Sequence, residues 1–426
     1  MRGKRLALAM MMVSAGLAAS APPLHAQVAP REVVTIDKAR IDAALKAMIA
    51  DGRAGGTSAL IWQDGREVYF GSAGLADREA KRPMRRDTIA QIYSMTKPVT
   101  GVALMQLWEA GKFRLDDPLA KYLPEYANMR AYAGKDAAGQ PRFVPAERPI
   151  TVRDILRHTA GFVYGAGPTP AHDAYVAAEP LALTIPLAEA SRRLATVPLL
   201  FQPGTQWEYS IAVDVQAALV EKLSGQPFAA YVQTHIFEPL RMRETAWRQP
   251  DARLPRFAAM NVKKDGKLVQ QAAADAQVLN FRDHALTPGG FGLASTLDDY
   301  QRFARMLINK GELDGARILK PSTVKLMATD QLDPEIKERS WLPSKGHVGF
   351  GFDFAVRKGQ PRTAEESRGA TGEYFWDGMA STLFWVDPAN KLTAVFFVQT
   401  IPYDGTLHRD FRVAVYGPDY RGPAGD

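Results

Sequence analysis

A serine and a lysine that could act together in catalysis, Ser94 and Lys97, stand three positions apart at the start of an apolar segment. The residues after them recur at helical spacing and stop at Gly111, which predicts a helix that stacks the two side chains on one face. The apolar positions are Val99, Val102, Ala103 and Leu107. A serine hydroxyl attacks once a base takes its proton, and a lysine in apolar surroundings holds its own proton weakly. The spacing therefore predicts Ser94 as a nucleophile beside a helix N-terminus, with Lys97 as its base.

The same pattern occurs a second time, from Ser322 to Lys325. A motif this short is expected about once by chance in a chain of this length. The second copy follows Pro321 and opens a polar helix, so a capping role for Ser322 and a solvated charge on Lys325 explain it. Other motifs are needed to decide what the first copy does.

The composition describes a globular chain with a mild positive charge. Its 426 residues include 53 Lys and Arg against 46 Asp and Glu, a formal net charge of +7 at pH 7, and the basic clusters are short. This balance argues against a nucleic-acid partner. Cysteine is absent, which excludes disulfides, thiolate catalysis and cysteine-ligated metal. The seven histidines lack the spacing of a zinc helix, so we expect no metal and no cofactor, and we interpret His158 and His284 as packing or loop residues.

Residues 1–26 have the pattern of a secretory signal peptide. A basic start precedes an apolar run over residues 6–19, and Ala26 offers a cleavage site before Gln27. An uncleaved membrane anchor is the alternative, but the run is short for a span. Removal would take three basic residues and no acidic one, lowering the net charge to +4. We therefore expect a periplasmic or secreted protein.

Two β-hairpins are predicted near opposite ends of the chain. Strands over 57–63 and 66–71 flank the turn pair Asp64-Gly65, and strands over 381–386 and 392–399 flank a second turn. One helical pattern precedes the first hairpin, and the others lie between the two hairpins. These patterns cover residues 41–49, 151–158, 211–223 and 228–240, and a capping box at Ser295 to Asp298 opens another through Ile308.

These elements predict an α+β fold in one catalytic domain over 27–426. An antiparallel sheet would be assembled from both chain ends and flanked by helices, with a helical lobe inserted in it. The α/β lobe would span about 27–105 and 290–426, and the helical lobe about 106–289. Three long loops rich in Pro, Gly and Ala or poor in periodicity would wall the cleft between the lobes. They are residues 124–149, 162–180 and 248–290.

Two further motifs follow the Ser94 motif in a fixed order. Tyr209-Ser-Ile211 stands directly before a predicted helix, and Trp376-Asp-Gly378 directly before a predicted strand. The ordered set resembles the three motifs of the penicillin-recognising serine hydrolases, the class C β-lactamase-like superfamily, and most resembles family VIII carboxylesterases. Four accompanying phrases, at residues 111–124, 158–161, 237–242 and 289–293, extend the likeness over about 40–400.

The resemblance implies a role for each motif residue and a β-lactamase or D,D-peptidase-like fold without a cofactor. Ser94 would be the nucleophile, and Lys97 with Tyr209 the pair that moves the proton. The backbone N–H groups of Ser94 and Met379 would form the oxyanion hole. A protonated lysine nearby would lower the pKa of Tyr209, so that its phenolate takes the serine proton. The motifs also imply substrate contacts from Tyr93, Ile211, Trp376, Asp377 and Gly378.

Two departures from the family pattern bear on the substrate. Trp376 stands where β-lactamases and D,D-peptidases of this superfamily carry a lysine for the substrate carboxylate, and Ile211 stands where they carry an asparagine for a substrate amide. Losing an ammonium and gaining an apolar wall favours neutral acyl groups. Asp377 would repel carboxylates if it faces inward, or else point to solvent. We therefore predict a hydrolase of small neutral carboxylic esters.

The alternatives keep the same fold. A β-lactamase or D-amino-acid amidase would need another cation for the carboxylate, for which Arg368 is a candidate by sequence proximity. A penicillin-binding protein would acylate without turnover. The Gly-x-Ser-x-Gly elbow of α/β-hydrolases is absent from the sequence. Residues 289–292 are interpreted as a loop packing near the active site. Oligomeric state and natural substrate are not predicted.

Overall fold

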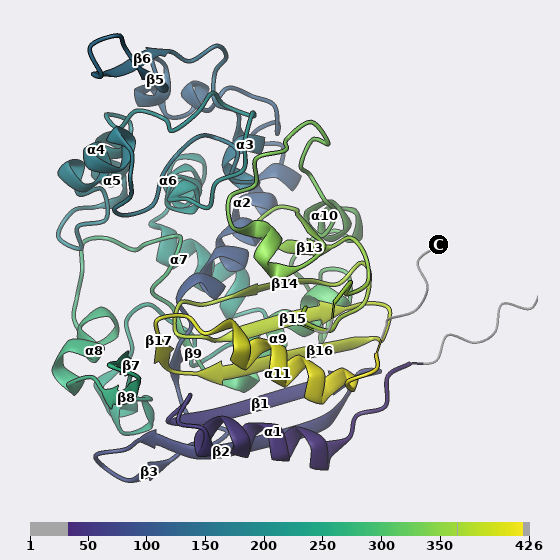
Figure 1. The fold of residues 1–426 in the computed structure, drawn as a ribbon. Coiled ribbons are helices and arrows are strands. Elements are labelled where there is room, and N and C mark those ends of the chain that lie inside the picture. Colours follow the sequence, from purple (N-terminus) through teal and green to yellow (C-terminus); the bar gives the residue numbers. More distant parts are fainter. Residues whose placement is uncertain (1–32, 364, 421–426) are drawn as a thin grey trace, which may run out of the picture. The chain divides into compact units, whose positions relative to one another are not determined.

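An eight-stranded antiparallel sheet organises the computed structural model, in which residues 33–363 and 365–420 are described (Figure 1). The predicted signal peptide lies outside the described residues. The strands in sheet order are β12 (Val348–Phe350), β13 (Ala355–Arg357), β14 (Tyr374–Asp377), β15 (Leu383–Asp387), β16 (Leu392–Val398), β1 (Gly56–Gln63), β2 (Arg66–Asp77) and β3 (Arg82–Pro83). Because β16 pairs with β1, the sheet joins the two chain ends, and this prediction is confirmed.

Both predicted hairpins are confirmed. The turn between β1 and β2 has φ of 50° at Asp64 and 75° at Gly65, the pair of positive values that a two-residue turn of this kind requires. The turn between β15 and β16 is fixed by a side chain instead. Asp387 accepts hydrogen bonds from the backbone N–H and the side-chain amide of Asn390, at 3.0 and 2.7 Å.

Helices cover both faces of the large sheet. Adjacent strand residues point to opposite faces, and in β15 Trp385 packs on Phe411 of α11 (Gly405–Tyr416), whereas Phe384 packs on Tyr300 of α9 (Leu297–Ile308). The helix α1 (Lys38–Ala50) lies beside α11 on the first face (Figure 1). The two faces therefore form separate packed layers around the sheet.

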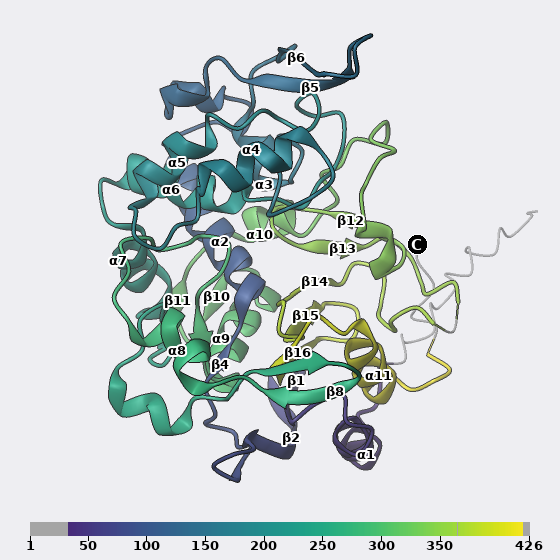
Figure 2. The ribbon, with the colours of Figure 1, turned by 60° about the vertical axis from the view of Figure 1, so that its left-hand side comes forward.

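The helix that follows the Ser94 motif, α2 (Thr96–Glu109), is buried on nearly all sides and packs against α6 (Ala212–Ser224). The described remainder between the sheet's two halves is largely helical: α3 (Val152–Leu156), α4 (Pro170–Ala178), α5 (Leu187–Leu194), α7 (Phe228–Val232), α8 (Ala273–Phe281) and, later, α10 (Pro321–Met327). In both views the hairpin of β5 (Arg130–Lys135) and β6 (Pro141–Pro145) lies beyond α3–α6, away from the large sheet (Figures 1 and 2). The remaining short pairings are β4 (Ala90–Gln91) with β9 (Ala294–Ser295), β10 (Glu312–Leu313) with β11 (Ala316–Arg317), and β7 (Asn261–Lys264) with β8 (Lys267–Gln270) and β17 (Thr400–Ile401).

Three local predictions were wrong in detail. The cap of α9 is Thr296, whose hydroxyl accepts from Asp299 N, because Ser295 is held in β9. The helix predicted over 228–240 is α-helical to Val232 and then widens into a π-helical turn, Gln233–Phe237. Ser322 lies inside the first turn of α10, whose cap position is Lys320, while Lys325 is solvent-exposed as expected. In the described part of the chain, no helix combines the length and apolarity that crossing a bilayer would take.

Candidate active site

Ser94 lies in a 3₁₀ turn, Tyr93–Met95, that leads directly into α2. Tyr93 adopts a φ of 43°, a left-handed conformation that large side chains rarely take and that concentrates at functional sites. Two long-range hydrogen bonds hold the turn: Tyr300 donates from its hydroxyl to Met95 O at 2.7 Å, and Ile92 N donates to Leu293 O at 3.0 Å. The neighbouring α9 and residues 289–293 thus keep the strained turn in place.

Lys97 sits in the first turn of α2 and is fully buried, with 1% of its surface exposed. Its Nζ donates to Ser94 Oγ at 3.3 Å and to Gly290 O at 2.8 Å. Burial lowers its pKa from 10.5 to about 8, although Asp214, Asp353 and, third, Asp377 favour its charged form. A substantial fraction of Lys97 is therefore neutral near pH 8 and able to take a proton from Ser94.

Tyr209 faces the lysine with its ring. Lys97 Nζ stands 4.6 Å from the ring centroid, and the ring stacks on Tyr164 at 6.0 Å. Burial raises the pKa of Tyr209. Ser94 and Trp376 lie near the Tyr209 hydroxyl and lower this pKa, but neither reaches hydrogen-bond geometry with it, so they offset the rise only in part. The predicted lowering of this pKa was wrong, because desolvation outweighs the neighbouring lysine. Tyr209 is thus a neutral phenol beside Ser94.

The third motif forms the end of β14 and the turn after it. Trp376 is 1% exposed, and its ring centroid lies 5.3 Å from that of Tyr209. A β-carbon on Gly378 would stand 2.4 Å from Ile92 O. The backbone at Gly378 therefore lies so close to the residue before the Ser94 turn that only glycine fits there. Met379, the next residue, is half exposed. The placement of its N–H in an oxyanion hole stays a prediction.

A cavity of about 770 Å³ opens beside Ser94. Seven of the sixteen residues that line it are aromatic: Tyr93, Tyr164, Tyr209, Phe291, Trp341, Trp376 and Tyr403. Of the sequence-predicted site residues, it brings together Tyr93, Ser94, Tyr209, Trp376, Asp377, Gly378 and Met379, with Lys97 directly behind Ser94. The arrangement combines a serine that contacts a buried lysine with an apolar chamber of the size that small-molecule substrates occupy.

Comparison with known proteins supplies the relationship. Residues 41–416 match the Beta-lactamase family. The chain belongs to that family. It is 31% identical to Esterase EstB of Burkholderia gladioli over 89% of this chain and 95% of that one, and 29% identical to Lovastatin esterase of Penicillium rubens over 80% and 87%. The solved structure of EstCE1, a hydrolase with promiscuous acyltransferase activity, superposes with a TM-score of 0.72 at 26% identity, covering 89% of this chain and 98% of that chain. The protein is thus a serine hydrolase of the β-lactamase fold with a family VIII-like relationship.

Within this Beta-lactamase family fold, Ile211 does not line the cavity. It is buried at the start of α6, where its N–H donates to Val163 O at 3.3 Å. Both alternatives predicted for Asp377 were wrong. Its carboxylate neither points to solvent nor stands free to repel a substrate carboxylate, because it forms a buried ion pair with Lys345. His408 Nδ1 lies 3.8 Å from the same carboxylate. The charge beside the predicted oxyanion hole is therefore compensated.

Lys345, which the sequence did not single out, is the cation at the cavity wall. Its Nζ lies 5.4 Å from the Trp376 ring centroid and 5.2 Å from that of Trp341. Arg368, the sequence candidate, is turned away and donates to Pro418 O and Thr363 O. Lys345 ends a short 3₁₀ turn, Leu342–Lys345, 31 positions before the third motif, and the sequence around it has no apolar periodicity that would mark it.

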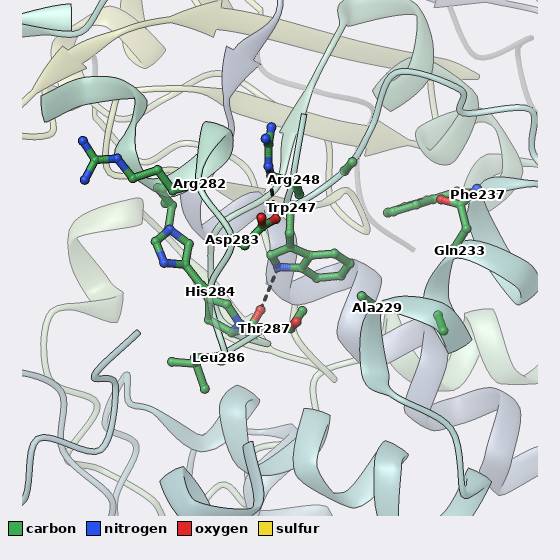
Figure 3. A pocket seen from close by; sticks show the side chains of 14 residues that line it. Ala229, Gln233, Phe237, Trp247, Arg248, Arg282, Asp283, His284, Leu286 and Thr287 are labelled. Atoms are coloured by element: carbon green, nitrogen blue, oxygen red, sulfur yellow. Dashed lines mark hydrogen bonds and ion pairs between the residues drawn. The ribbon is translucent and has the colours of Figure 1, made fainter. Parts of the chain in front are cut away.

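Figure 3 shows a second cavity, of about 360 Å³. Leu279 lines both this cavity and the first. Trp247 and Pro288 both line it, and the indole N–H of Trp247 donates to Pro288 O at 2.9 Å and to Phe291 O at 3.1 Å. His284 borders this cavity and bonds Val278 O through Nε2, consistent with a loop role. Among the described residues that line it, none is a serine or lysine, so it lacks the chemistry of the first cavity. Over 33–363 and 365–420, no three His, Asp or Glu side chains group as metal ligands would.

Proposed function

We propose that the protein is a serine carboxylesterase that cleaves small neutral carboxylic esters through an acyl-enzyme on Ser94. The observation that carries the proposal is the position of the Ser94–Lys97 pair at an aromatic cavity whose cation, Lys345, is already paired with Asp377. A substrate carboxylate would have to displace Asp377 from that pair. A neutral ester gains the apolar contact without this cost.

In the proposed mechanism, neutral Lys97 takes the hydroxyl proton of Ser94 as Oγ bonds to the ester carbonyl carbon. The N–H groups of Ser94 and Met379 would hold the oxyanion that forms. The C–O bond to the alcohol then breaks, and the leaving alkoxide receives the proton from Lys97, with the Tyr209 phenol as the relay beside Ser94. Water repeats the sequence on the acyl-enzyme and releases the acid.

A second candidate is transfer of the acyl group from Ser94 to an alcohol. The largely apolar wall of the cavity favours binding of an organic acceptor in place of water. The similarity to EstCE1, a hydrolase with promiscuous acyltransferase activity, supports this second candidate. Product analysis of an ester reaction with added alcohol separates transfer from hydrolysis.

A paired turnover assay tests the esterase proposal against a β-lactamase function. We expect kcat/KM for p-nitrophenyl butyrate to exceed that for a chromogenic cephalosporin by more than tenfold, because the cephalosporin carboxylate lacks a free cation in the cavity. Both activities should vanish in Ser94→Ala. Cephalosporin cleavage faster by tenfold would contradict the proposal and point to Lys345 as the group that holds the carboxylate.

We also propose that residues 1–26 direct export and are then removed. The basic start, apolar run and Ala26 support this. After expression of the full chain in a Gram-negative host, the mature protein is expected in the periplasmic fraction with an N-terminus near Gln27. A cytoplasmic product that keeps residues 1–26, seen by intact mass, would contradict it.

A further inference from the structure

Asp214, on the first turn of α6, bonds the backbone segment whose carbonyl accepts from Lys97. Its Oδ1 accepts hydrogen bonds from Gly289 N at 2.9 Å and from Gly290 N at 3.2 Å. The carbonyl of the same Gly290 accepts from Lys97 Nζ at 2.8 Å. Asp214 is 4% exposed, so these bonds form away from water. The position of the lysine therefore depends on a carboxylate it does not touch.

The second oxygen of Asp214 has no hydrogen-bond partner among the described residues. A β-carbon built on Gly290 would stand 2.8 Å from Asp214 Oδ2 and 3.1 Å from Lys97 Nζ. The carboxylate and the amine therefore lie on either side of the position that a side chain at residue 290 would fill. The absence of a side chain at Gly290 lets them approach. The carboxylate favours the charged form of Lys97, and Lys97 in turn favours the charged form of Asp214.

The other groups around Lys97 are less able to balance a new positive charge. Asp353, between β12 and β13, has a pKa raised well above its usual range by burial, and Asp377 of β14 is paired with Lys345. The rings of Tyr164 and Tyr209 face the ammonium at 5.3 and 4.6 Å. Burial and Lys97 lower the pKa of His158, which keeps that ring neutral.

We propose that Asp214 is a positioning residue that fixes Lys97 through the backbone of Gly289 and Gly290 and supplies the counter-charge for the ammonium formed when Lys97 takes the Ser94 proton. The inference rests on the proposed function. Acylation creates a positive charge on a buried side chain, which is costly unless an opposite charge is near. Burial raises the pKa of Asp214 to about 6, so it remains ionised where Lys97 acts.

The variant Asp214→Asn tests this, because the amide oxygen can still accept the two N–H bonds while the charge is lost. We expect the rising limb of kcat/KM against pH to move down by about one unit or more. The plateau should fall on the order of tenfold, since Lys97 becomes a weaker base. A purely structural role would lower activity without moving the limb, and an unmoved limb overturns the proposal.

Asp299→Asn is the matched control. Asp299 is also buried and accepts hydrogen bonds from Glu244 N at 2.6 Å and from Thr245 Oγ1 at 3.0 Å. It is not among the groups that shift the pKa of Lys97. The Asp299→Asn variant should therefore leave the rising limb of kcat/KM against pH in place. If Asp214→Asn fails to fold, Gly290→Ala keeps both charges and forces them apart, so it must move the limb in the same direction or the proposal is wrong.

A measurement without substrate separates this inference from the esterase proposal. In protein labelled with ¹³C at lysine Cε, the Lys97 signal is assigned by its loss in Lys97→Met and titrated by NMR. We expect its midpoint to fall in Asp214→Asn and to stay unchanged in Asp299→Asn. Absence of ester turnover in the wild type would remove the proposed function, whereas an unchanged Lys97 midpoint in Asp214→Asn would remove the role of Asp214.

Discussion

Replacement of Ser94 by alanine is expected to lower kcat/KM for p-nitrophenyl butyrate by on the order of 10⁵-fold or more. Without Oγ no acyl-enzyme forms, and the remaining groups can only orient a water molecule. The side chain is small and lies in a turn held by backbone contacts, so the variant should fold normally. Stopped-flow turnover with circular dichroism on the same samples measures both effects.

The second Ser-x-x-Lys copy supplies the control for this variant. Ser322 is solvent-exposed in the first turn of α10, so Ser322→Ala should leave turnover unchanged. A p-nitrophenyl alkylphosphonate should add one phosphonyl mass to wild type and to Ser322→Ala, and none to Ser94→Ala. Retention of more than about a thousandth of wild-type activity in Ser94→Ala would place the nucleophile elsewhere.

The features that could be predicted from the sequence are those encoded by neighbouring residues. The turn pair Asp64-Gly65 has the backbone conformation that its residue types favour, and this fixed the first hairpin. The hairpin signals at the two chain ends correctly indicated one shared sheet, with β16 beside β1. The motif order placed Ser94, Tyr209 and Trp376 around one cavity. Residues 289–292 were interpreted as a loop near the site, and Gly290 O indeed accepts from Lys97.

The features that could not be predicted depend on contacts between distant segments. Lys345 reaches the cavity from the end of a short 3₁₀ turn whose sequence shows no periodicity, and its ion pair with Asp377 compensates the charge of that carboxylate. The pKa of Tyr209 was predicted in the wrong direction, because its sign is set by how much aromatic surface encloses the ring. Ile211 shares a motif with Tyr209 yet turns into the core at the start of α6. Sequence spacing gives the neighbours of a residue along the chain, whereas burial and charge pairing depend on the whole fold.

Replacement of Lys97 by methionine is expected to lower kcat/KM by on the order of 10³-fold to 10⁴-fold, the upper part of the usual contribution of a positioned base. Methionine has a similar volume and suits the buried site, so folding should survive. The wild-type profile carries a second signature. Burial lowers the pKa of Lys97 to about 8, and the neutral form that accepts a proton predominates above that value. Wild-type kcat/KM should therefore rise with pH through about 8, and Lys97→Met should lose this limb.

Lys325→Met, in the exposed second copy, should change neither the rate nor the profile. The profile also decides which of the two proton-handling residues is the base. If the Tyr209 phenolate took the serine proton, the rise would come at a pH far above 8, because burial raises the pKa of that phenol. A limb near 8 that disappears with Lys97 identifies the lysine as the base and leaves the neutral phenol to relay the proton to the leaving alcohol. A limb that persists in Lys97→Met would contradict that assignment, whatever the size of the rate loss.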